Sequence, residues 1–137
     1  MAEAPISETK AWIIKAWRDL ETARRVATGE QPFYDVGAYH CQQAAEKSVK
    51  AFLVHHGKHI EKTHDIEVLV DLAADIDPKL RQLTDAADTL TPYATRFRYP
   101  NAIFAVEPQP DEYHEAFKCA KAIYDLVLQH LPADVRP

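Results

Sequence analysis

The sequence contains little glycine and few sulfur-containing residues: three glycines, one methionine and two cysteines in 137 residues. Glycine is scarce and the prolines fall between stretches of periodic apolar residues, which predicts helices separated by breaks. Cys41 and Cys119 have no CxxC spacing, and each is expected to be a small buried residue rather than half of a disulfide.

Several functional classes lack their sequence signals. No uncharged apolar run approaches the ~18 residues of a membrane span, and the N-terminus has no apolar signal core, so we expect a cytoplasmic protein. A Ser-His-Asp spacing, a glycine-rich phosphate loop and a paired-carboxylate motif are all missing, which argues against hydrolases and kinases. We expect no cofactor.

The composition is that of one soluble domain spanning residues 1–137, with 47% hydrophobic and 27% charged residues. The net charge of −5 argues against a general nucleic-acid coat. The charge is uneven, however. Residues 40–64 hold four lysines against two glutamates, whereas residues 65–93 hold seven acids against two bases. An anion-binding surface is therefore expected on the first of these segments.

The apolar periodicity predicts an all-α fold, an up-and-down bundle of about five helices. The helices are expected at residues 7–28, 34–56, 65–74, 78–92 and 111–131, with a long loop over residues 94–110. We expect nine residues in the core: Trp17, Leu20, Cys41, Ala45, Phe52, Leu69, Leu83, Phe117 and Tyr124.

The second predicted helix carries many polar residues beside its apolar face. Gln43, Lys47 and Lys50 share a stripe with His40, and Glu46 can pair with Lys50 at i,i+4. One interpretation is a solvated face with a single salt bridge. The other is a groove that binds a nucleotide or a dimer partner, since glutamine suits a base edge and lysine suits a phosphate.

The long loop contains a second candidate group, formed by Arg96, Arg98 and Tyr99. Two guanidinium groups could bind phosphate while the ring stacks on a base. Alternatively, the aromatic residues only attach the loop to the bundle.

The histidines do not predict a metal site. His55 and His59 have helical i,i+4 spacing, but Gly57 lies between them and no third ligand is evident. His64 either fixes the turn before the third helix or lines the candidate groove.

Four blocks of the sequence resemble the HEPN (higher eukaryotes and prokaryotes nucleotide-binding) family. They are WRDLETAR from Trp17, HCQQAAEKSVKAFL from His40, THDIEVL from Thr63, and RYP from Arg98. The resemblance implies a bundle of about five helices, often a homodimer. It also implies a minimal nucleotidyltransferase encoded nearby as a partner, often in a toxin–antitoxin pair.

Many HEPN proteins are ribonucleases with an Arg-x4–6-His motif, but no arginine of this sequence has a histidine five to seven residues later. We therefore assign no catalytic residue, and the resemblance favours a nucleotide-binding or partner-binding role. Two alternatives stay open. One is a ribonuclease with a degenerate site built from His40, His64, Arg96 or Arg98, and the other is a non-catalytic homodimeric interaction module.

Overall fold

The secondary structure of the described residues is helical. The computed structural model describes residues 6–58, 60, 63–96 and 107–137, and no strand occurs in these ranges. The α-helices are α1 (Ile6–Val26), α2 (Tyr34–His55), α3 (Ile66–Ile76), α4 (Thr84–Leu90), α5 (Tyr93–Arg96) and α6 (Pro110–Gln129). The all-α prediction is confirmed. The fourth predicted helix begins as a 3₁₀ helix, Pro78–Leu83, and α5 is a single turn that runs into the start of the predicted loop.

Local sequence explains where these helices begin and end. Gly57 has a left-handed φ of 71°, and its N–H donates to Val54 while the N–H of Lys58 donates to Leu53. This Schellman arrangement satisfies the last carbonyls of α2. Asp65 caps α3 by accepting hydrogen bonds from the backbone of Glu67 and Val68. Gly57 and Asp65 therefore set the end of α2 and the start of α3, close to the predicted bounds.

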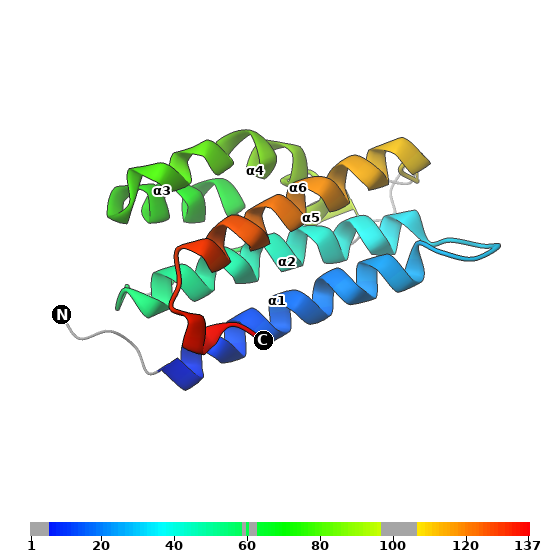
Figure 1. Ribbon diagram of the computed structural model, residues 1–137. Helices are drawn as coiled ribbons and strands as arrows, with labels where there is room; N and C mark the ends of the chain where they lie inside the picture. The colour runs from blue at the N-terminus through cyan, green and yellow to red at the C-terminus, as the bar shows by residue number, and fades with distance from the viewer. Residues whose placement is uncertain (1–5, 59, 61–62, 97–106) are drawn as a thin grey trace.

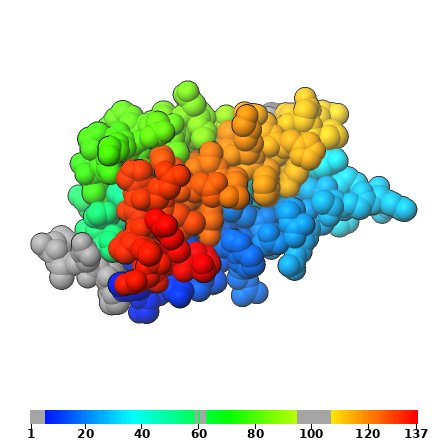
Figure 2. Space-filling view, in the orientation of Figure 1, coloured from blue at the N-terminus to red at the C-terminus, as the bar shows by residue number. Residues whose placement is uncertain are grey.

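Helix α2 lies at the centre of the bundle: α1 packs along one side of it, and α6 and the α3–α4 pair pack on the other, where α6 also contacts α4 (Figure 1). In the space-filling view, α6 lies in front of α2, and the C-terminal residues, which contact α1, lie next to α1 (Figure 2). Most of α2 is consequently buried, including polar positions such as Gln42, Glu46 and Lys50.

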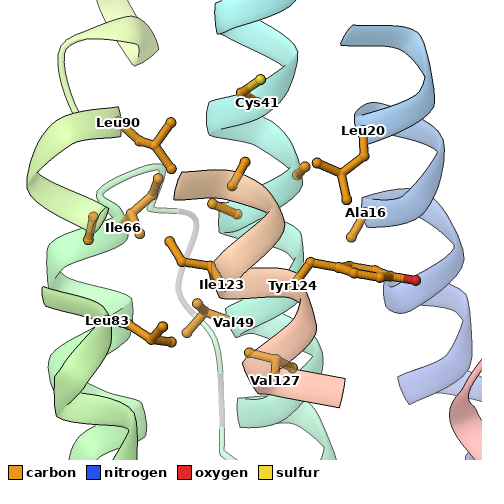
Figure 3. Packing of buried hydrophobic residues seen from close by; sticks show 14 of the residues in the cluster. Ala16, Leu20, Cys41, Val49, Ile66, Leu83, Leu90, Ile123, Tyr124 and Val127 are labelled. Carbon is orange, nitrogen blue, oxygen red and sulfur yellow. The ribbon is translucent and has the colours of Figure 1, made fainter. Parts of the chain in front are cut away.

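The core fills the space around α2 with aliphatic side chains (Figure 3). Alanines at the α1–α2 contact, among them Ala16, Ala23, Ala44 and Ala51, are fully buried and let the two helices approach closely. Seven of the predicted core residues are buried: Leu20, Cys41, Ala45, Phe52, Leu69, Leu83 and Tyr124.

The prediction that Trp17 is buried is wrong, because this side chain is 45% exposed. The small residues Ala16 and Ala23 determine which side of α1 faces the core. Trp17 is rotated away from that side and lies at the edge of the bundle, beside Phe117. Phe117 itself is only partly buried.

The described helices include none that is both long enough and apolar enough to cross a membrane.

Candidate functional site

Asp19 of α1 joins two of the predicted polar residues of α2. Its carboxylate lies 2.9 Å from His40 Nδ1 and 2.7 Å from Lys47 Nζ. His40 and Lys47 are seven residues apart, two turns along one face of the helix. Asp19 was not among the predicted site residues, and its position in a helix 28 residues before Lys47 gives no local sequence signal.

The two bases change the ionisation of Asp19. Burial alone would raise the pKa of the Asp19 carboxyl, but hydrogen bonds and charge from His40 and Lys47 hold the pKa below its ordinary value. Asp19 is therefore a carboxylate at neutral pH, and it orients both side chains.

Glu46 forms a second, more deeply buried group on the neighbouring face of α2. Its carboxylate accepts a hydrogen bond from Lys50 Nζ at 2.8 Å and lies 3.1 Å from His64 Nδ1. Gln42 donates to the same carboxylate at 3.2 Å and to the His64 carbonyl at 3.1 Å. Gln42 was missed by the sequence analysis, although its i,i+4 spacing to Glu46 was visible.

Lys50 is placed differently from the other predicted phosphate ligands. Its side chain is only 8% exposed and is paired with Glu46, and its ammonium lies 5.7 Å from the ring centre of Trp12. The charge of Lys50 is thus compensated inside the protein. A direct contact of Lys50 with a nucleotide stays a prediction.

Gln43 lies between the two carboxylate groups. Its amide nitrogen donates to the Tyr39 hydroxyl at 2.7 Å, and both side chains are partly buried. This bond uses one N–H of the amide, which leaves the second N–H and the amide oxygen of Gln43 for a ligand.

The two groups share three chemical components, and Gln42 adds an amide to the Glu46 group. Each carboxylate holds one histidine through Nδ1 and one lysine through Nζ. When Nδ1 of a neutral imidazole donates its proton to a carboxylate, Nε2 keeps a lone pair. For His40 and His64, Nε2 has no hydrogen-bond partner within the described ranges. The face can therefore present two oriented imidazoles, one amide and one partly exposed lysine.

No described contact places the predicted loop group of Arg96, Arg98 and Tyr99 on the polar face of α2. Arg96 ends α5, and Arg98 and Tyr99 lie outside the described residues. Their predicted role in nucleotide binding stays a prediction.

Within the described part of the chain, no three His, Cys, Asp or Glu side chains come together as metal ligands would.

Comparison with known proteins identifies the class of this fold. Residues 9–131 match the HEPN domain family, so the chain belongs to the HEPN family. An archaeal HEPN homologue, ST0689, is similar to it with a TM-score of 0.71 and 28% identity, over 89% of this chain and 96% of that one. The protein TT1696 from Thermus thermophilus is similar with a TM-score of 0.70 and 25% identity, over 90% and 98%. A search of curated proteins gave no match.

Proposed function

We propose that this HEPN protein binds a nucleotide or RNA on the polar face of α2 and acts with a separate nucleotidyltransferase, as one half of a toxin–antitoxin-like pair. The observation that carries the proposal is the pair of carboxylate-held histidine–lysine groups on either side of Gln43. Holding these polar side chains in one orientation, along a helix that is otherwise buried, costs conformational entropy. Contacts with a bound ligand offset that cost.

Each group has a chemical role in this proposal. Gln43 contacts a base edge, Lys47 contacts a phosphate, and the imidazoles of His40 and His64 accept hydrogen bonds from a base or ribose. Arg98 and Tyr99 add a phosphate contact and a stacking ring.

Calorimetry with ATP and with a short RNA, at a stated salt concentration, tests binding. Lys47→Ala and Arg98→Ala should each weaken binding by roughly 1–3 kcal/mol, the scale of a hydrogen bond to a charged group. Lys118→Ala, which removes an exposed cation of α6, should leave the affinity unchanged. Unchanged affinity in both site variants, with the fold intact, would show that the face is only solvated.

The partner and the oligomeric state need separate measurements. A nucleotidyltransferase encoded in the neighbouring reading frame should copurify with this protein in a fixed ratio after co-expression. Light scattering of the protein alone should give the mass of a homodimer, as the family resemblance implies. A monomer at high micromolar concentration contradicts the dimer.

The oriented imidazoles favour one second function, RNA cleavage. A histidine whose Nδ1 is held by a carboxylate has the geometry of a general base. Incubating purified protein with tRNA or mRNA tests this function. Cleavage that disappears in both His40→Ala and His64→Ala would establish it, and intact RNA in the presence of the wild-type protein would exclude it.

A further inference from the structure

A groove of about 460 Å³ runs along the outer side of α1 and meets the polar face of α2 at Lys47. Its lining residues recur at helical spacing, so they share one side of α1. At 1.5 Å per residue the groove extends for about 16 Å, the length of α1 between its first and last lining residues. The lining consists of Ala11, Ile14, Lys15, Arg18, Asp19 and Thr22 of α1 and Lys47 of α2.

The groove is positively charged, although the chain as a whole is acidic. Three cations line it with one carboxylate, Asp19, and that carboxylate already binds Lys47 and His40. Lys15 and Arg18 are exposed and have no carboxylate partner within the described ranges. A cleft with uncompensated cations attracts anions regardless of the net charge of the protein.

Two other cations of the bundle show the contrast. Arg24, two turns further along α1, is paired with Glu21 at 2.8 Å, and Lys121 of α6 is paired with Asp125 at 2.6 Å. Lys15 and Arg18 are therefore available to a ligand in a way that these residues are not.

The shape and donors of the groove indicate which anion it takes. The Thr22 hydroxyl donates to the Arg18 carbonyl, so the side-chain donors that face a ligand belong to cations. Such a lining binds phosphates but does not read bases. Lys15 and Arg18 are i,i+3 neighbours with Cβ atoms about 5–6 Å apart, so their long side chains can reach successive phosphates of a strand. Ile14, 39% exposed, offers an apolar surface to sugars.

We propose that this groove binds the phosphodiester backbone of a single-stranded RNA, with Lys15 and Arg18 on successive phosphates. The inference rests on the proposed function, because Lys47 belongs to both surfaces: the strand whose base meets Gln43 continues along α1. A mononucleotide is held on α2 alone, whereas an oligonucleotide uses both surfaces.

Fluorescence anisotropy tests the proposal with a labelled uridine oligonucleotide of about 12 nucleotides, a length within the range of single-strand sites. The variant Lys15→Ala/Arg18→Ala should bind this oligonucleotide about tenfold more weakly or worse. The slope of log Kobs against log salt should become shallower by about 1.4, for two lost phosphate contacts on a single strand. Binding of UTP should not change.

The matched control is Arg25→Ala, which removes an exposed cation of the same helix outside the groove and should leave both affinities unchanged. Circular dichroism and the melting temperature confirm that each variant is folded. If the double variant binds the oligonucleotide normally while Gln43→Ala weakens it, the groove proposal is overturned and the proposed function stands. If wild-type protein binds neither RNA nor UTP, the groove proposal and the proposed function are both overturned. Competition by polyglutamate as effective as that by unlabelled RNA would also overturn the assignment to RNA.

Discussion

Gly37 of α2 lies against the ring of Tyr113 of α6 so closely that a Cβ on Gly37 would come within 2.7 Å of Tyr113 Cε1. The ring is held in place by its hydroxyl, which donates to the Ala23 carbonyl of α1 at 3.1 Å, and this carbonyl would itself lie 3.4 Å from a Cβ on Gly37. Glycine at this position therefore lets α1, α2 and α6 meet around one buried tyrosine.

This contact predicts that Gly37→Ala destabilises the protein. Alanine would gain roughly 1 kcal/mol of helix propensity, but overpacking against a ring that cannot turn away costs roughly 1–3 kcal/mol. Denaturant unfolding should show a net loss of stability. In a Tyr113→Ala background the Gly37→Ala substitution should stabilise the protein, because the clash with the ring is gone and only the gain in helix propensity remains. A higher melting temperature for Gly37→Ala in the wild-type background would refute the close contact.

Asp19 predicts a pH dependence of stability. Because its folded-state pKa lies below the ordinary value of 3.8, its contribution is fully present above that value and is lost as the pH falls through the folded-state pKa. Asp19→Asn should lower the free energy of unfolding by roughly 1–2 kcal/mol at pH 7. The difference from wild type should shrink below about pH 4. Urea titrations at several pH values measure this difference in the free energy of unfolding.

The control for this experiment is Asp125→Asn, which removes an exposed i,i+4 pair with Lys121 and should change stability little at any pH. A difference between wild type and Asp19→Asn that stays constant down to about pH 2, well below the ordinary carboxyl pKa, would contradict the described role of the Asp19 carboxylate.

The buried pair of Glu46 and Lys50 predicts strong coupling between two substitutions. Lys50→Met keeps the apolar stem beside Trp12 but leaves a buried carboxylate without its lysine, at a cost of about 3 kcal/mol. Adding Glu46→Gln should recover part of that loss. A double-mutant cycle in denaturant should therefore give a coupling energy of about 1 kcal/mol or more. Additive effects would mean that the two side chains do not interact in solution.

The two cysteines should react differently with alkylating reagents. Cys41 is fully buried, and burial raises the pKa of its thiol to about 12. Cys119 is partly exposed, although burial raises its pKa as well. At about pH 8, near the pKa of a free thiol, native protein should be alkylated slowly at Cys119 and not at Cys41, whereas both should react in denaturant. Peptide mass spectrometry distinguishes the sites, and rapid native labelling of Cys41 would contradict this packing.

The helices could be predicted because their signals are local. The stop at Gly57, the cap at Asp65 and the proline that opens the 3₁₀ helix at Pro78 are read from a few neighbouring residues. The exposure of Trp17 could not be predicted from neighbouring residues, because it depends on which side of α1 packs against α2.

The candidate site was only partly predictable for a similar reason. The stripe of Gln43 and Lys47 follows from helical spacing, but the carboxylate that orients Lys47 comes from another helix. Lys15 and Arg18 resemble ordinary surface residues in the sequence. Their importance arises only when two packed helices form a groove between distant parts of the chain.

The central position of α2 also has a consequence for synthesis of the chain on the ribosome. Helix α1 can pair with α2 once residue 55 has emerged, but α6 covers the other side of α2 only after residue 129. Until then, apolar side chains on the α6 side of α2 are uncovered; Val49, which lies toward Ile123 of α6 (Figure 3) and is fully buried in the finished bundle, is one of them. The nascent chain therefore passes through an aggregation-prone stage that ends only when its last helix docks.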